Sequence, residues 1–170
     1  MTLYKTLIRS HLEYASVIWN PAKKSMINKL ERVQRKFVKF FCFKFDIHYV
    51  SEKYELIRSQ LGLESIEERR TSNDLIFLYR VINNQSDCPL ILEKLNIRVP
   101  SYFSRNNDFF YIPYHRIDAR KNSPIIRSMR EFNELTAVCP KVDFSLSLKN
   151  FKRTVKCAQT ELNVQSIQQV

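Results

Sequence analysis

Five cations follow one face of a predicted helix, and their chemistry is the neutralisation of phosphate. The helix is expected within KLERVQRKFVKFF, residues 29–41, because apolar side chains recur there at intervals of three and four. The apolar positions are Leu30, Val33, Phe37 and Phe41, and the cations on the opposite arc are Lys29, Arg32, Arg35, Lys36 and Lys39. Like charges at this spacing repel by about 0.2–0.5 kcal/mol per pair. A bound polyphosphate would offset that repulsion and release its counterions.

The charge of the surrounding chain favours the same interpretation. Residues 23–44 carry eight cations and one acid, Glu31, which is a net charge of +7. The whole chain carries 28 cations and 17 acids, a balance typical of proteins with a polyanionic partner such as nucleic acid. An ordinary solvated face in a basic protein is the alternative. An anionic membrane is a competing partner, but no apolar run reaches the roughly 18 residues of a spanning helix.

Residue types that carry catalysis occur without the spacing that catalysis needs. The chain has no Asp-Asp pair, and its acidic doublet Glu67-Glu68 falls in the first turn of a predicted helix, where the helix dipole explains it. The histidines lack metal-binding spacing and the cysteines form no C-x-x-C pair. These residues are His11, His48, His115, Cys42, Cys88, Cys139 and Cys157. We therefore expect no catalytic residue, no metal site, no cofactor and no independent enzyme.

The elements that must position these residues are predicted to be helices. A single glycine, Gly62, disfavours sheets and excludes glycine-rich phosphate loops. The expected helices are 2–19, about 23–42, 52–61, 65–83, 89–95, 123–135 and 143–159. The predicted fold class is mostly α, a helical bundle with a short irregular or β-containing segment around residues 96–118.

Local signals mark several helix ends. Ser65 and Glu68 have the spacing of a capping box, and Gly62 sits where a left-handed residue ends a helix. Ser51 is expected to cap the helix 52–61. The run LIFLYRVI, residues 75–82, is apolar nearly all round and predicts a central buried helix.

Two further cationic clusters are weaker candidates. One mixes cations with aromatic rings that could stack unpaired bases, although core packing is the favoured interpretation. Its residues are Tyr102, Phe103, Arg105, Phe109, Phe110, Tyr111, Tyr114, Arg116, Arg120 and Lys121. The other, expected to be a solvated patch on the last helix, consists of Lys149, Lys152, Arg153 and Lys156.

Taken together, the segments resemble the region after the polymerase palm in reverse transcriptases of non-LTR retrotransposons, above all the jockey-like insect elements. LYKTLIRSHLEYASVIWNP and INKLERVQRKFVKF are similar to that family's runs LY..L.RS.LEYAS.IWNP and I..IE.VQ.KF. The later segments LGLESIEERRTSNDLIFLYRVIN, SPIIRSMREFNEL and FSLSLKNFK match further runs. The resemblance covers residue 3 to about residue 153, and its motifs are specific only in combination.

The resemblance implies a fragment of an RNA-directed DNA polymerase. The family's catalytic aspartates lie upstream, in a palm motif of the F/Y-A-D-D kind that this sequence does not contain, and the family's endonuclease domain is missing too. The implied organisation is a thumb-like helical region at 1–95 that includes the basic helix, a mixed C-terminal region at 96–160 and a frayed tail at 161–170. Because Met1 falls on the post-palm helix, we expect a truncated insertion or a gene model begun inside one.

The expected function is non-catalytic, sequence-indifferent binding to the RNA or DNA backbone of a primer-template, with a polymerase palm as a further partner in the intact parent. The alternative is a structural or interaction module that packs on the missing palm through residues 96–116 and binds no nucleic acid itself. No membrane and no small-molecule substrate is expected. Lys5, Arg9 and His11 interrupt the N-terminal segment, so it is not a signal peptide, and we expect an intracellular protein of the nucleus or cytoplasm.

Overall fold

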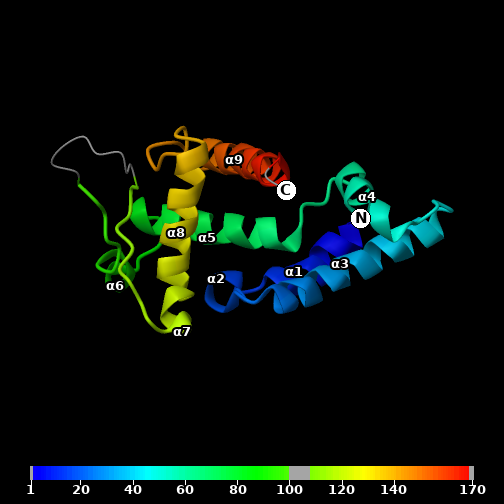
Figure 1. The fold of residues 1–170 in the computed structure, drawn as a ribbon, viewed down its shortest axis with the longest axis horizontal. Coiled ribbons are helices and arrows are strands. Elements are labelled where there is room, and N and C mark those ends of the chain that lie inside the picture. Colours follow the sequence, from blue (N-terminus) through cyan, green and yellow to red (C-terminus); the bar gives the residue numbers. More distant parts are fainter. Residues whose placement is uncertain (1, 100–107, 169–170) are drawn as a thin grey trace. The chain divides into compact units, whose positions relative to one another are not determined.

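The chain is mostly helical, as predicted, and divides into two compact units, Met1–Arg70 and Thr71–Val170 (Figure 1). The computed structural model describes the backbone of residues 2–99 and 108–168 and the side chains of 2–99 and 108–162. The boundary between the units falls inside helix α5 (Ile66–Ile82), whereas the sequence suggested one near residue 95. Each unit has its own hydrophobic core.

The first unit begins with a helical segment that is broken where the sequence predicts one helix over residues 2–19. Its parts are η1 (Tyr4–Ile8), α1 (Arg9–Glu13) and α2 (Ser16–Trp19). The break lies at Ala15, whose φ of 49° is left-handed. Because the helix stops there, the Leu12 carbonyl is available to accept a hydrogen bond from Arg70 Nη2 at 2.6 Å. The Arg70 guanidinium also lies 3.8 Å from the centre of the Trp19 ring.

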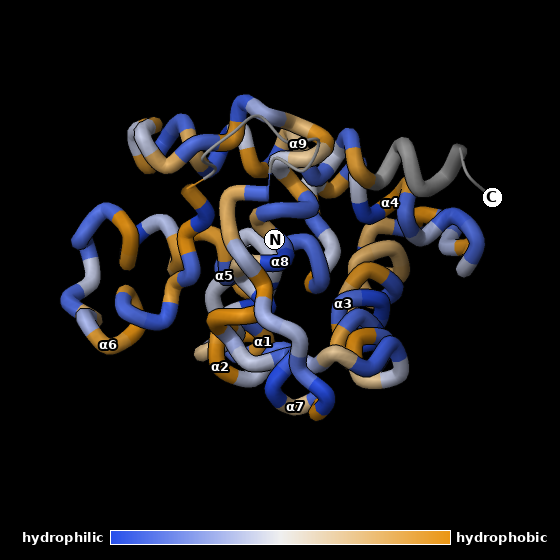
Figure 2. Tube along the Cα trace, turned by 60° about the vertical axis from the view of Figure 1, so that its left-hand side comes forward, coloured by the Kyte–Doolittle hydropathy of each residue, from blue (hydrophilic) through white to orange (hydrophobic). Residues whose placement is uncertain are grey.

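The long helix α3 (Lys24–Lys44) lies beside this segment, and it is followed by η2 (Ser51–Lys53) and α4 (Tyr54–Gln60). Along α3 hydrophilic and hydrophobic residues alternate in the backbone trace (Figure 2), as expected for a helix with two faces. The buried core of the unit comprises Tyr4, Val38, Cys42, Tyr54, Ile57 and Leu63.

Two predicted helix signals in this unit are confirmed and one is wrong. Gly62 has a φ of 64°, and the Leu63 amide donates to the Arg58 carbonyl at 3.0 Å, which closes α4. The capping box at the start of α5 is formed in both directions, since Ser65 and Glu68 each accept a hydrogen bond from the other's backbone amide. Ser51 does not cap α4, because the 3₁₀ turn η2 intervenes and no side-chain cap forms there.

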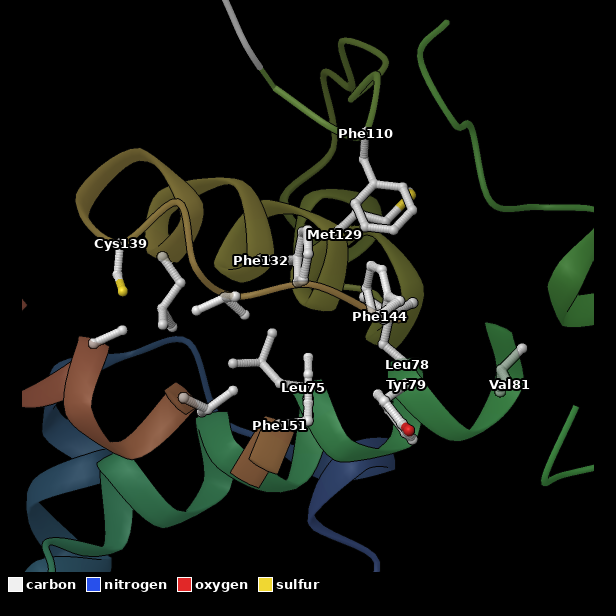
Figure 3. Close-up of a cluster of buried hydrophobic side chains, with 14 of the residues drawn as sticks. Leu75, Leu78, Tyr79, Val81, Phe110, Met129, Phe132, Cys139, Phe144 and Phe151 are labelled. Carbon is white, nitrogen blue, oxygen red and sulfur yellow. The ribbon is translucent and has the colours of Figure 1, made fainter. Parts of the chain in front are cut away.

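The second unit packs the rest of α5 with α8 (Pro124–Val138) and α9 (Leu148–Gln168). The shorter helices are α6 (Pro89–Leu92) and α7 (Asp118–Lys121). In the close-up of the core (Figure 3), Leu75 and Leu78 of α5 point towards Met129 and Phe132 of α8. Only Arg80 is exposed among residues 75–82, which confirms the prediction of a buried helix.

The segment around residues 96–118 is irregular in its described part. One isolated antiparallel bridge joins Ile97 and Phe110 there, and no longer β ladder forms in residues 96–99 and 108–118. Phe110 is buried, and the Asn133 side chain bonds both its amide and its carbonyl, at 3.0 and 2.8 Å. Residues 161–168, which the sequence assigns to a frayed tail, belong to α9.

A group of buried charges joins α5 to α8 within the second unit. Arg127 donates to both oxygens of Asp74, at 2.7 and 3.2 Å, and the Asp74 side chain is fully buried. Glu131 lies on the same face of α8, with Oε1 4.0 Å from Arg127 Nε. Its Oε2 is buried and has no hydrogen-bond partner among the side chains and backbone that the structure describes. Burial raises the pKa of Glu131 to about 8, and the nearby Asp74 carboxylate adds to the shift while Arg127 opposes it.

This arrangement predicts that stability falls as pH rises from about 4.5 to about 8. Over that range the folded protein keeps a proton on Glu131 that the unfolded chain has lost, so unfolding releases a proton. The slope contributed by one proton is at most about 1.4 kcal/mol per pH unit. Glu131→Gln, which mimics the protonated carboxyl, should flatten the pH dependence of the free energy of unfolding measured by urea denaturation.

The matched control is Glu134→Gln, because Glu134 lies on the same helix with 62% of its side chain exposed. This variant should keep the pH dependence of the unmodified chain. An unchanged pH dependence in Glu131→Gln would show that Glu131 is ionised in the folded protein.

Candidate nucleic-acid interface

All five predicted phosphate ligands lie on α3 and are exposed. The helix is continuous from Lys24 to Lys44, so the spacing assumed from the sequence is the spacing in the structure. Within residues 2–99 and 108–162, none of the five forms an ion pair with an acid. The cations are Lys29, Arg32, Arg35, Lys36 and Lys39, and they are called the cationic arc below.

The inward face of α3 is turned slightly from the one that the sequence suggested. Gln34, Val38 and Cys42 are fully buried, while Val33 is 37% exposed and does not belong to the core. Phe37 packs partly buried against the same core, and its ring stacks on Tyr4 with centres 4.0 Å apart. The fully buried residues of α3 are therefore spaced by four, and the first of them is a glutamine.

The Gln34 amide is buried among four hydrogen-bonding groups, one of which is Glu31 Oε1 at 3.3 Å from Nε2. The Tyr4 hydroxyl donates to Gln34 Oε1 at 2.7 Å, and Gln34 Nε2 donates to the Glu64 carbonyl at 2.9 Å. The Tyr54 hydroxyl lies 3.4 Å from the same nitrogen. Because its hydrogen bonds are formed, the buried Gln34 amide links the N-terminal helical segment, α3 and the chain just before α5. Sequence reasoning missed Gln34, although its spacing of four from Leu30 and Val38 was a signal.

Glu31 is the one acid among residues 23–44, and its carboxylate accepts hydrogen bonds from groups of the unit other than the arc. The Tyr54 hydroxyl donates to Glu31 Oε1 at 2.6 Å, and the Ile66 amide donates to Oε2 at 3.0 Å. Glu31 thus accepts at the first turn of α5, where a negative charge is favoured. Its charge serves contacts inside the unit rather than the neutralisation of the arc.

Burial around this network keeps the two phenols protonated. Burial, followed by the charge of Glu31, raises the pKa of Tyr4 to about 12. Burial also raises the pKa of Tyr54, and the hydrogen bond to Glu31 adds to that shift. Both hydroxyls therefore remain hydrogen-bond donors at neutral pH.

Other acids of the first unit pair with cations outside the arc. Arg69 donates to both Glu13 and Glu64, and the bond to Glu13 is the main reason that the pKa of Arg69 is raised. The further pairs are Arg58 with Glu68 at 3.6 Å, Lys24 with Glu67 at 3.4 Å and Arg9 with Glu13 at 3.4 Å. These acids therefore pair with cations outside the arc, and the arc on α3 keeps its positive charge.

Arg35 differs from the rest of the arc. Its guanidinium carbon lies 4.9 Å from the centre of the Tyr54 ring, so the side chain packs against α4 as a cation–π contact. Replacing Arg35 would disturb packing as well as charge. Lys29, Arg32, Lys36 and Lys39 are therefore the better residues for testing charge alone.

The weaker clusters are only partly assembled. Phe109 and Phe110 belong to the core of the second unit, which confirms the core interpretation for them, while Tyr111 and Tyr114 are exposed. Tyr102, Phe103 and Arg105 lie outside the described residues. The remaining cations of both clusters are exposed: Arg116, Arg120, Lys121, Lys149, Lys152, Arg153 and Lys156.

Neither metal ligation nor membrane spanning emerges from the described residues. No group of three or more His, Cys, Asp or Glu side chains there is placed to hold a metal ion. In the same part of the chain, no helix combines the length and the apolar character that crossing a membrane requires. All four cysteines are free thiols.

Removing the Glu31 carboxylate should loosen the first turn of α5. In Glu31→Ala the Tyr54 hydroxyl and the Ile66 amide lose their acceptor, so the free energy of unfolding should fall by about 1–3 kcal/mol. Hydrogen exchange at the Ile66 amide, followed by NMR, should become faster. The control on the same helix is Lys36→Ala, an exposed position where a change within about 0.5 kcal/mol is expected. Unchanged protection of Ile66 in Glu31→Ala would contradict this role.

Comparisons of the chain with known proteins do not identify a family for it. No family description, no curated protein and no solved structure matches the chain. The features that point to an interface are the exposed cations of α3, the hydrogen bonds that Glu31 makes inside the unit and the sequence motifs.

Proposed function

We propose that this chain binds the phosphate backbone of nucleic acid through the cationic arc of α3, without catalysing a reaction. The observation that carries the proposal is that five exposed cations share one face of a continuous helix while the adjacent acid, Glu31, is bonded inside the unit. Binding of this kind is indifferent to base sequence and depends strongly on salt.

Geometry makes the arc a suitable track for a polyanion. Lys29 and Lys39 are ten residues apart, which is about 15 Å along an α-helix. Side chains at three- and four-residue spacing stand side by side on that surface, so their repulsion persists in the free protein. A row of phosphates removes the repulsion and gains the entropy of released counterions. A merely solvated face would gain neither.

The proposed origin is the post-palm region of a non-LTR retrotransposon reverse transcriptase, of which this chain would be a non-catalytic fragment. The support is that the motifs behind the resemblance contact one another in the first unit. Glu13 and Trp19, from LEYASVIW, meet Arg69 and Arg70, from SIEERR. Glu31, from the LERVQ run, accepts from the amide of Ile66 in the same later motif. The motifs that carry the resemblance are therefore also in contact with one another in the folded unit.

An interaction module is the second candidate, and the N-terminal helical segment favours it. Large apolar side chains there face solvent, which is typical of a surface covered in a larger assembly. They are Leu3, Leu7, Tyr14 and Ile18, each at least 59% exposed. In this alternative the N-terminal segment, rather than residues 96–116 as the sequence suggested, packs on a polymerase palm, and the chain has no affinity of its own for nucleic acid.

The test compares two triple substitutions that each remove three positive charges. Arg32→Gln, Lys36→Gln and Lys39→Gln change the arc, and Lys149→Gln, Lys152→Gln and Arg153→Gln change exposed cations of α9. Fluorescence anisotropy with a single-stranded oligonucleotide gives the binding constant at several salt concentrations. The arc variant should weaken binding at low salt and reduce the slope of log K against log salt by about 2. The α9 variant should leave the slope unchanged.

If both variants lost the same affinity, the effect would depend only on the net charge of the chain, which would contradict a site on α3. Undetectable binding by the unmodified chain, together with self-association in sedimentation, would favour the interaction module. Circular dichroism checks that both variants keep the helical fold, which substitution of exposed side chains should not alter.

A further inference from the structure

Two phenylalanines next to the cationic arc are exposed to solvent. Phe40 is 60% exposed and Phe43 is 85% exposed, although both lie inside a regular helix. Burying a phenylalanine side chain is worth about 1.5–3 kcal/mol, and Phe37 and Phe41 of the same helix do pack inward or against other rings. Neither Phe40 nor Phe43 has an aromatic partner among residues 2–99 and 108–162. Packing of this unit does not account for the two rings.

The rings share their side of α3 with two lysines. Lys36, Lys39, Phe40 and Phe43 are spaced as i, i+3, i+4 and i+7, which places them on one stripe of the helix surface. Lys36 precedes Phe40 by four residues, and Lys39 precedes Phe43 by four. Each exposed ring is therefore the surface neighbour of an exposed ammonium group.

We propose that this stripe binds single-stranded nucleic acid, with phosphates at Lys36 and Lys39 and unpaired bases stacked on Phe40 and Phe43. The inference builds on the proposed phosphate binding and names the kind of nucleic acid that the site takes. A single strand alternates charged phosphates with flat bases, and a stripe that pairs ammonium groups with aromatic rings matches both. In a duplex the bases stack on one another and are not available to the rings, so single strands are preferred.

The same features disfavour a membrane surface and a second copy of the chain. A helix that lies on a membrane keeps its apolar face apart from its cations, whereas the apolar face of α3 is already occupied by the core of its own unit. A symmetric dimer formed through the stripe would set the lysines of one copy against those of the other, which is unfavourable. A polyanion with exposed π-faces complements the charges and the rings together.

The test uses two ligands that differ only in their bases: an oligothymidylate and an abasic oligonucleotide of the same length. The unmodified chain should bind the first more tightly. The double variant Phe40→Ala, Phe43→Ala should lose that preference, with a decrease of about tenfold or more per ring, while its salt slope stays unchanged because the cations remain. The matched control is Tyr111→Ala, Tyr114→Ala, because these rings are 61% and 87% exposed on the other unit. This control should keep the preference.

The outcomes separate stacking from phosphate binding. If the phenylalanine variant keeps the preference while the arc variant of Arg32, Lys36 and Lys39 loses affinity, stacking is wrong and phosphate binding stands. If neither variant changes affinity, both proposals fall. Tighter binding to phosphatidylserine vesicles than to the oligothymidylate, or an effect of the phenylalanine variant on self-association alone, would assign the rings to another partner and overturn the inference.

Discussion

The Glu31 carboxylate is the contact on which the arrangement of α3 depends. Two donors from different elements converge on it, the Tyr54 hydroxyl at 2.6 Å and the Ile66 amide at 3.0 Å. Together with the buried Gln34 amide, it fixes which side of α3 faces the core. Because α3 is a single unbroken helix, fixing that side also fixes the side on which the cations stand.

This arrangement separates charge by role. In residues 1–70 there are fourteen cations and eight acids, so no pairing could neutralise the unit. Several acids are held by Arg58, by Arg69 and by the amide of Ile66 at the start of α5. The surplus of positive charge is left on α3, where the desolvation cost of burying it is avoided and a polyanion can reach it. The structure thus concentrates on α3 a positive field that acids spread evenly over the surface would have weakened.

Features that depend on nearby residues could be predicted from the sequence. The capping box of Ser65 and Glu68, the left-handed Gly62 and the buried run of α5 follow from local spacing, and all three are present. The position of the cations on one exposed side of α3 followed in the same way.

Features that depend on partners distant in sequence could not be predicted. The break at Ala15 is accompanied by a hydrogen bond from Arg70 to the Leu12 carbonyl, more than fifty residues away in the chain. The hydroxyls of Tyr4 and Tyr54 converge on the buried Gln34, and Val33, which precedes it, is 37% exposed. Local periodicity ranks glutamine as polar and exposed, so only the folded partners reveal its place. Phe40 and Phe43 were overlooked for the opposite reason, since apolar residues are assumed to be buried.

Lysine acetylation in the presence and absence of a single-stranded oligonucleotide tests phosphate binding by α3 most directly. Mass spectrometry would report the modification rate of each lysine in the full chain at low salt. Lys29, Lys36 and Lys39 should be acetylated more slowly when the oligonucleotide is bound. The exposed lysines of α9, Lys149, Lys152 and Lys156, should react at an unchanged rate and serve as the internal reference. Protection of the α9 lysines instead, or equal protection of both helices, would contradict a phosphate-binding site on α3.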